Sequence, residues 1–347
     1  MSILEVSSPA PRDRWNELVA RSDRALPEHV PEWTDAICAS GRFGDVSRHY
    51  RFDSGAEAVL PLVARRGLTG IGGWANSYPP AWGIGGPVHT GLTTDEAVAV
   101  VQDLGGLGFQ RVGLRPDPLE GPLWAAAAHR AGVDTIARRA HVLDLSEGVD
   151  AVWAATSKSA RRNVRQARKA GVRIEVARGG RLLEEYYELY LTSVDRWAEF
   201  QREPRALARA RAQARDPLGK LRTLGQALGQ RFHVLLAYVD DQPAAGAIVV
   251  TGRTAHSIRA AMDKSRIGDT QAAVLANWTE IEVAAGAGCR TLHLGESGRS
   301  RQLAFAKEKW GARPYDYVEL RIERLPWTRV DSALRTGVKR AIGFRDD

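Results

Sequence analysis

The residues with the clearest chemical pattern lie in one predicted helix, within the stretch Ser157–Val172. At about 100° per residue, the cations of this helix fall within an arc of ~120°. They are Arg161, Arg162, Arg165, Arg168 and Lys169. A face with charges of one sign is typical of a surface that binds phosphates. The alternative is the solvated face of an amphipathic helix. Lys158, Arg161, Arg162 and Arg165 are the candidate phosphate ligands.

Four residues of the second half could take part in proton transfer: Asp263, His293, Glu296 and Tyr315. Glu296 comes after a predicted strand, at the end where α/β sheets usually place ligands. His293 alternates with two leucines, so it leaves their side and faces either a cleft or solvent. A lone histidine is more often structural than catalytic. His293 and Glu296 are therefore candidates for an acid or a base, with the choice open.

Three further residues could contact a bound molecule. Tyr78 and Trp82 lie in Gly67–Pro87, a Gly/Pro-rich segment without a regular period that predicts a loop with short strands. Loop aromatics suggest the wall of a binding site, and packing in the core is the equal alternative. Arg196 lies on a predicted helix, where its forked guanidinium suits a phosphate or carboxylate. Its alternative role is a salt bridge to Asp195 or Glu199.

Several common kinds of site have no matching pattern in the sequence. The histidines are scattered, and no His/Cys/Asp/Glu cluster has the spacing of metal ligands. No Gly-x-Ser-x-Gly elbow, Walker loop or Rossmann loop occurs. The two cysteines, Cys38 and Cys289, are too few for a disulfide framework and predict buried thiols in a reducing compartment. We therefore expect no metal and no tightly bound cofactor.

The composition predicts a globular protein of two domains. The chain has 347 residues, 44% hydrophobic and 26% charged, with a net charge of +8 and a pI of about 9.7. This charge favours an anionic partner, although Asp and Glu are also plentiful. No stretch has the roughly 18 apolar residues of a membrane helix, and the N-terminus does not resemble a signal peptide. The expected location is the cytoplasm.

Strands and helices alternate along both halves, which predicts an α/β fold with mixed, largely antiparallel sheets flanked by helices. In the first half we expect strands at 46–52, 56–65, 110–115 and 134–145, and helices at 11–20, 31–40, 93–104 and 121–131. In the second half we expect strands at 172–177, 232–239, 244–251, 254–262, 291–294 and 317–322. Its helices are expected at 149–170, 181–200, 204–230, 271–285 and 302–310.

The two halves share a local repeat. Gly106–Leu114 and Gly286–Leu294 both run from a helix end through Gly-x-Gly into a short strand. The matching order of elements predicts a duplicated α/β unit. We place the boundary near Ser146–Asp150, with domains at 1–147 and 148–347.

Three stretches of the second half carry a family resemblance. They are the basic segment 157–172, the hairpin 235–250 with Ala244-Ala245-Gly246, and Leu292-His293-Leu294-Gly295 followed by Ala306-Lys307-Glu308-Lys309-Trp310-Gly311. Together with Ile84-Gly85-Gly86-Pro87-Val88, they resemble the FemAB-like branch of the GNAT acyltransferase superfamily, also called the BioF2-like or acetyltransferase 6 group. The resemblance implies two tandem GNAT-like domains. It also implies that Lys307 contacts the acyl donor or the oxyanion, and that Arg196 contacts the acceptor.

The sequence departs from the family pattern in two places. Ala306 stands where the family usually has Phe, and the pyrophosphate loop of acetyl-CoA enzymes is absent. The nearest substitute is Arg266–Gln271, in which Arg266 and Gly268 precede a predicted helix. An anion at that helix N-terminus and a helix start capped by Thr270 are the two alternatives.

The resemblance implies transfer of an acyl group to an amine. One hypothesis is a Fem-like aminoacyltransferase that takes its acyl group from aminoacyl-tRNA, which the basic helix favours. The second is an acyl-CoA-dependent N-acetyltransferase, and the third a non-enzymatic module that binds tRNA or a precursor. The catalytic candidates are Lys307, Glu296 and His293. The candidates for the walls of the acceptor site, a small molecule or peptide, are Arg196, Tyr78, Trp82, Trp310 and Tyr315.

Overall fold

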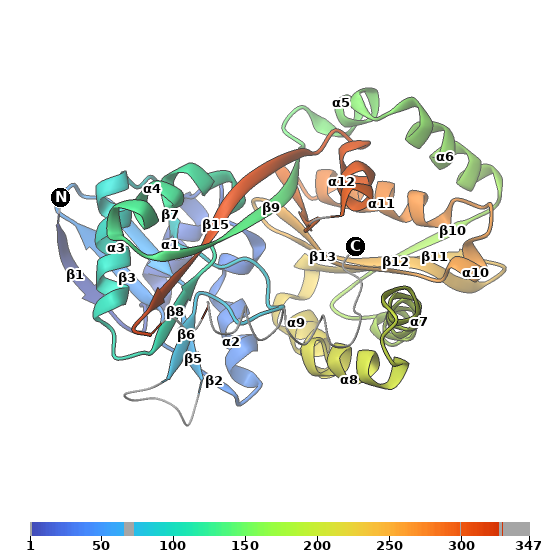
Figure 1. Ribbon diagram of the computed structural model, residues 1–347. Helices are drawn as coiled ribbons and strands as arrows, with labels where there is room; N and C mark the ends of the chain where they lie inside the picture. Colours follow the sequence, from blue (N-terminus) through green and yellow to red (C-terminus); the bar gives the residue numbers. More distant parts are fainter. Residues whose placement is uncertain (1, 66–72, 299, 326–327, 329–347) are drawn as a thin grey trace. The chain divides into compact units, whose positions relative to one another are not determined.

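The computed structural model of the protein describes residues 2–65, 73–298, 300–325 and 328. It divides the chain into two compact units, each with helices and strands (Figure 1). Unit 1 takes the described residues up to Ala140 and again from Tyr315, whereas unit 2 runs from His141 to Pro314. The predicted α/β class, with mixed and largely antiparallel sheets flanked by helices, is confirmed.

Unit 1 contains two groups of strands. The first is an antiparallel sheet in the order β1 (Ile3–Ser7), β3 (Arg48–Phe52), β4 (Glu57–Leu60) and β7 (Val88–His89). The second has the order β15 (Arg313–Glu323), β8 (Arg111–Leu114), β6 (Trp74–Asn76), β5 (Val63–Arg65) and β2 (Phe43–Asp45). Its α-helices are α1 (Arg12–Arg21), α2 (Pro31–Ala39), α3 (Thr94–Gly106) and α4 (Gly121–Ala131). The expected loop 67–87 lies partly outside the described residues.

Unit 2 is built on a sheet whose strands follow the chain order. They are β10 (Arg173–Arg178), β11 (Phe232–Val239), β12 (Gln242–Thr251), β13 (Ala255–Met262) and β14 (Thr291–Glu296). Neighbours are antiparallel except for β13 and β14, which are parallel. The predicted hairpin is present, and its turn residues Asp240 and Asp241 both have a positive φ, as a tight two-residue hairpin turn requires.

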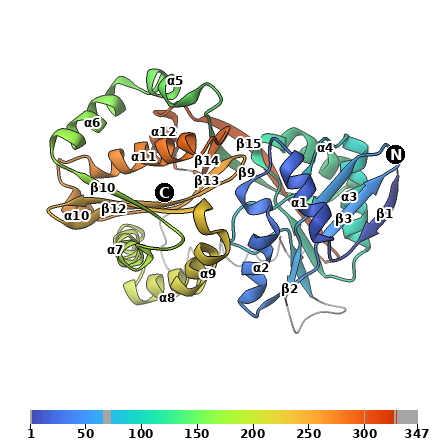
Figure 2. The same cartoon turned by 180° about the vertical axis from the view of Figure 1, so that it is seen from behind.

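Helices cover both faces of this sheet (Figures 1 and 2). One face carries α5 (Gly148–Ala155), α6 (Lys158–Lys169), α11 (Ala272–Gly286) and α12 (Arg301–Glu308). The other carries α7 (Leu183–Gln201), α8 (Arg205–Arg215) and α9 (Leu218–Leu228). The apolar side of α6, with Ala160, Val164 and Ala167 buried, packs into a core shared with α11 and the strands. This burial leaves the cationic side of α6 facing outward.

Two long predicted helices are each divided in the structure. The expected helix 149–170 is α5 and α6, because Ser157 caps a new helix and accepts a hydrogen bond from the N–H of Ala160. The expected helix 204–230 is α8 and α9. It breaks at Asp216-Pro217, because proline has no N–H to donate within a helix. Helical propensity predicted both regions correctly and missed both breaks.

The unit boundaries differ from the predicted division at 147/148. The chain leaves unit 1 at the end of Ala140, inside β9 (Asp134–Asp144), and returns at Tyr315, inside β15. It returns because β15 pairs with β8 in an antiparallel register that sets Leu320 opposite Leu114. Strands that pair across so long a stretch of sequence have no local sequence pattern that predicts the pairing. The repeated helix–Gly-x-Gly–strand order is present as α3–β8 and α11–β14.

Within the described residues, no helix is both long and apolar enough to cross a membrane.

Asp216, at the break between α8 and α9, is the centre of a buried charge cluster. Its carboxylate accepts hydrogen bonds from Arg259 at 2.7 and 2.9 Å and from Lys220 at 2.7 Å, and it pairs with Arg215 at 3.1 Å. Burial alone would raise the pKa of Asp216, but the charges of Arg259 and Lys220 outweigh it and hold that pKa below its ordinary value. The cluster therefore anchors α8 and α9 to β13.

Replacing this central carboxylate should destabilise unit 2. We expect Asp216→Ala to lower the free energy of unfolding by about 3–5 kcal/mol, because it leaves the buried Lys220 ammonium without its partner. Urea denaturation measures this. The matched control is Asp195→Ala, which breaks a more exposed pair with Arg209 and should cost less than about 1 kcal/mol. Equal losses in the two variants would contradict the central role of Asp216.

Candidate active site

Lys307 lies where strand β14 ends. The chain leaves β14 through Gly295, whose φ of +71° is a left-handed conformation that glycine adopts without strain. It then enters α12, whose first turn is capped by Ser300. From α12, the Lys307 amine reaches back to the strand end and donates to the carbonyl oxygens of Gly295 and Glu296, both at 2.9 Å. The structure thus brings Lys307 and Glu296 together.

The surroundings of Lys307 change its basicity. Burial lowers the pKa of the Lys307 amine to about 8, while the charges of Glu296 and Glu280 oppose that shift. At neutral pH the amine is therefore mostly an ammonium ion held at the strand end. A partly desolvated cation at a fixed place can stabilise negative charge that develops on a reacting atom.

Glu280, on α11, was not among the predicted site residues. Its side chain is buried, and burial raises the pKa of the Glu280 carboxyl to about 7, against the opposing effects of a hydrogen bond from Ser257 and the charge of Lys307. The sequence does contain a signal. The residues one turn away on either side, Ala276 and Ala284, are both small, apolar and buried, so Glu280 interrupts an inward-facing stripe of α11.

The other acid–base candidates lie in different surroundings. His293 is fully buried, and its ring packs edge-on against that of His256, with centroids 6.1 Å apart. It does not face solvent, which was one of its two predicted positions. Asp263 caps α10 (Lys264–Ile267) by accepting hydrogen bonds from the N–H and hydroxyl of Ser265. Tyr315 belongs to unit 1. Glu296 is the candidate whose backbone carbonyl oxygen accepts a hydrogen bond from Lys307.

The outward face of α6 matches the predicted cationic surface. Arg162, Arg165 and Lys158 are exposed there. Arg165 lies over the ring of Trp153, 5.9 Å from its centroid. Arg161 is half-buried and approaches the carbonyl oxygens of Trp153 and Ala154, so part of its role is to close the end of α5.

The loop before α11 lies against this helix. The Gln166 side chain on α6 donates to the carbonyl oxygen of Asp269 at 2.9 Å. In the same loop, Arg266 pairs with Asp263 at 3.3 Å, and Gly268 ends α10 at a φ of +46°. The predicted cap by Thr270 is wrong, because the residue before α11 is Gln271, whose side chain makes no cap hydrogen bond. The hydrogen bond from Gln166 to Asp269 thus connects α6 to the segment that carries Arg266 and Gly268.

Arg196 occupies a half-buried position on α7. Its guanidinium approaches the carbonyl oxygen of Met262 at 3.5 Å, and burial lowers its pKa. The predicted alternative was a salt bridge from Arg196 to Asp195 or Glu199. In the described residues these two acids pair with other arginines, Asp195 with Arg209 and Glu199 with Arg205. Arg196 therefore stays a candidate for binding an anionic group.

Three of the predicted aromatic residues are part of the core. In unit 1, Tyr78 is buried and donates to the carbonyl oxygen of Glu28 at 2.6 Å, and Trp82 is buried and accepts at its carbonyl from the Trp33 indole. In unit 2, Trp310 is buried beside Trp278, with ring centroids 6.0 Å apart. Packing accounts for all three residues, which for Tyr78 and Trp82 is one of the two predicted alternatives, and their place in an acceptor site stays a prediction.

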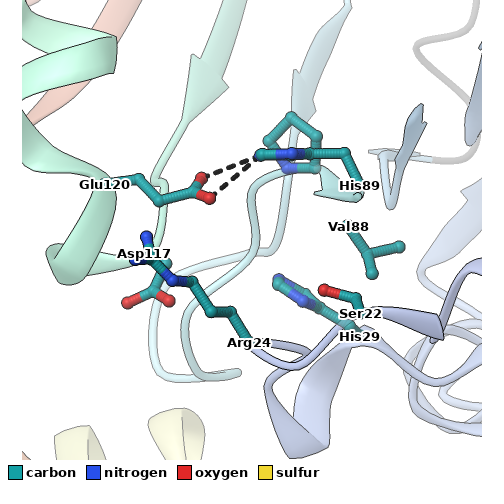
Figure 3. Close-up of a pocket in the computed structure, with 8 residues that line it drawn as sticks. Ser22, Arg24, His29, Val88, His89, Asp117 and Glu120 are labelled. Atoms are coloured by element: carbon teal, nitrogen blue, oxygen red, sulfur yellow. Dashed lines mark hydrogen bonds and ion pairs between the residues drawn. The ribbon is translucent and has the colours of Figure 1, made fainter. Parts of the chain in front are cut away.

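Unit 1 has a small pocket of its own, lined by His29, His89, Asp117 and Glu120, with Arg24 at its side (Figure 3). The His89 Nε2 atom lies 3.0 Å from a carboxylate oxygen of Glu120. The volume of about 10 Å³ suits a single water molecule rather than an acceptor substrate. Among the described residues, no group of three or more His, Cys, Asp or Glu side chains could hold a metal ion.

Comparisons with known proteins identify the domain family and the fold. Residues 154–308 match the acetyltransferase (GNAT) domain family. The crystal structure of FemX is similar over 91% of this chain and 97% of its own length, with a TM-score of 0.66 and 11% sequence identity. A conserved protein of unknown function from Bacteroides thetaiotaomicron is similar over 91% and 99%, with a TM-score of 0.54 and 10% identity. At such low sequence identities, these structural similarities show a shared fold and nothing more.

No curated protein matches the sequence. The family match covers α6, the sheet of unit 2, α11, α12 and Lys307. The resemblance expected from the sequence is confirmed, as is the prediction of an acyltransferase, and residues 154–308 form an acyltransferase domain of the GNAT type.

Proposed function

We propose that the protein forms an amide bond by transferring an aminoacyl group from aminoacyl-tRNA to the amine of a small molecule or peptide. The observation that carries the proposal is the Lys307 ammonium, held half-buried against two carbonyl oxygens at the end of β14. A cation in this position suits the oxyanion of acyl transfer. Glu296, the last residue of the same strand, is the candidate base beside it.

The proposed reaction has no covalent enzyme intermediate. The neutral amine of the acceptor attacks the ester carbonyl of the donor, and a C–N bond forms. The carbonyl oxygen becomes negative, and the Lys307 ammonium stabilises that charge. The oxyanion then collapses, the ester C–O bond breaks, and the ribose oxygen leaves. The proton lost by the amine passes to Glu296, directly or through water, and the leaving oxygen takes up a proton.

The exposed cations of α6 support tRNA as the donor. Lys158, Arg162 and Arg165 span about two turns, or roughly 10 Å at 1.5 Å per residue, and they point outward. A surface of this length suits successive phosphates of a nucleic-acid backbone. Acyl-CoA is the second candidate donor, because the matched family is an acetyltransferase family. In either case the co-substrate is a phosphorylated carrier, and we expect no tightly bound cofactor.

Removing the Lys307 cation should abolish catalysis while the protein stays folded. We expect Lys307→Met to lower kcat by at least ~10²–10³-fold, the usual cost of losing one oxyanion stabiliser. The assay measures amide formation on N-acetyl-lysine amide with alanyl-tRNA or acetyl-CoA. The control is Lys309→Met, which removes a neighbouring amine that lies over the Trp310 ring. Turnover by Lys307→Met at the wild-type rate, with either donor, would disprove the role.

The α6 surface should govern how donor binding responds to salt. Arg162→Ala combined with Arg165→Ala should weaken binding of alanyl-tRNA and flatten its log–log salt slope by about one to two units, because two phosphates lose their cations. Binding across a salt series measures the slope. Arg205→Ala with Arg222→Ala removes two exposed arginines from α8 and α9 and should leave the slope unchanged. If tRNA binds no better than polyglutamate and acetyl-CoA alone supports turnover, acyl-CoA is the donor.

A further inference from the structure

Glu280 is a buried acidic residue with no evident structural role. It lies on the inward side of α11, with 3% of its surface exposed. One carboxyl oxygen is engaged by the Ser257 hydroxyl, and Oε2 has no hydrogen-bond partner among the described residues. A buried carboxyl that serves only the fold normally has its oxygens satisfied. The unsatisfied oxygen therefore calls for another explanation.

The strand register brings Glu280 and Lys307 to the same place. In the parallel pair β13–β14, Ala255 lies opposite Leu292 and His256 opposite His293. Ser257, the next residue of β13, donates a side-chain hydrogen bond to the Glu280 carboxyl. On the neighbouring strand β14, ~5 Å away, the chain continues from His293 to Gly295, and the carbonyl oxygen of Gly295 accepts a hydrogen bond from the Lys307 amine. Helices α11 and α12 lie over the same face of the sheet (Figure 1).

We propose that Glu280 is a positioning residue for acyl transfer, whose buried carboxylate keeps the Lys307 side chain in its ammonium form at the end of β14. The inference rests on the proposed function, because it assumes that the charge on Lys307 serves the reaction. Glu280 does not touch the reacting atoms. It acts through Lys307, since a negative charge in a partly desolvated site favours protonation of a nearby amine.

Within the part of the chain that the structure describes, few other charges act on this pair. Lys307 is influenced by Glu296 of β14 and Glu280 of α11, and by burial. Glu280 is influenced first by burial and then by Ser257 and Lys307. The pKa of Tyr186 on α7 is raised mainly by burial, with a smaller contribution from Glu280. Nearby charged groups engage other partners. Glu282 pairs with Arg168, Glu308 faces His141, and the rings of His256 and His293 pack against each other.

The pKa values make the proposal testable by pH. Burial raises the pKa of Glu280 to about 7, so its carboxyl is mostly protonated at pH 6 and mostly ionised at pH 8. The Lys307 amine, with a pKa of about 8, loses its proton as the pH rises through that value. Glu280→Gln keeps the size of the side chain and removes only the charge. The turnover rate of the variant should therefore equal that of the wild type at pH 6 and differ from it above pH 7.

The direct measurement is the titration of Lys307 itself. Lysine is scarce in the sequence, so ¹⁵N-lysine labelling followed by NMR gives few signals, and Lys307→Met assigns the one required. We expect the midpoint to move below pH 8 in Glu280→Gln and to stay in place in Glu184→Gln, a matched control whose carboxylate pairs with Arg222 on the surface. Glu280→Asp, which keeps the charge, should restore the midpoint at least in part.

Turnover and stability should respond in opposite directions. The rate of Glu280→Gln should fall below that of the wild type only above pH 7. Its melting temperature there should rise, because a carboxyl whose pKa is higher in the folded state destabilises the fold as pH rises from its unfolded value, 4.5, to about 7. A purely structural Glu280 would instead give a loss of rate at every pH.

The outcomes separate this inference from the proposed function. An unchanged Lys307 midpoint in Glu280→Gln, or a loss of rate that is the same at pH 6 and pH 8.5, would overturn the role of Glu280. If Lys307→Met is inactive in that case, the proposed function stands without it. If Lys307→Met is fully active, the proposed function falls, whatever Glu280 does to the Lys307 titration.

Discussion

The sheet of unit 2 keeps ionisable groups out of water on both of its faces, and the desolvation of these groups governs the chemistry of the domain. Burial disfavours the charged form of every such group, so each needs partners or a shifted pKa. On the face covered by α7, α8 and α9, the carboxylate of Asp216 has three cationic partners and stays ionised. On the opposite face, Glu280 and Lys307 have fewer partners.

This contrast separates a structural cluster from a reactive one. Asp216 is surrounded by hydrogen-bond donors, and its pKa is lowered further below neutral pH. Burial instead brings the pKa values of Glu280 and Lys307 to about 7 and about 8, where a small change in surroundings alters their charge. Groups that titrate near neutrality are typical of sites that carry out proton transfer or charge stabilisation. Of these two groups, Glu280 is buried and Lys307, at the end of β14, is partly exposed.

Much of this arrangement was predictable from the sequence, and the exceptions have physical causes. The cationic face of α6 follows from helical periodicity, whereas the interest in Lys307 came mainly from the family resemblance. The burial of Tyr78, Trp82 and Trp310 could not be decided from the sequence, because an aromatic residue near a turn packs inward or outward according to tertiary contacts. Glu280 was missed because its significance depends on Ser257 and Lys307, which only the sheet and α12 bring near it.

The course of the chain through β9 and β15 has a consequence for biosynthesis. Unit 2 is, in connectivity, an insertion between two parts of unit 1. Strand β8 meets its partner β15 only after about two hundred further residues have been made. All of the described part of unit 2 is synthesised in that interval. On the ribosome the acyltransferase domain can therefore fold before unit 1 is complete, because the edge of β8 stays unpaired until β15 emerges.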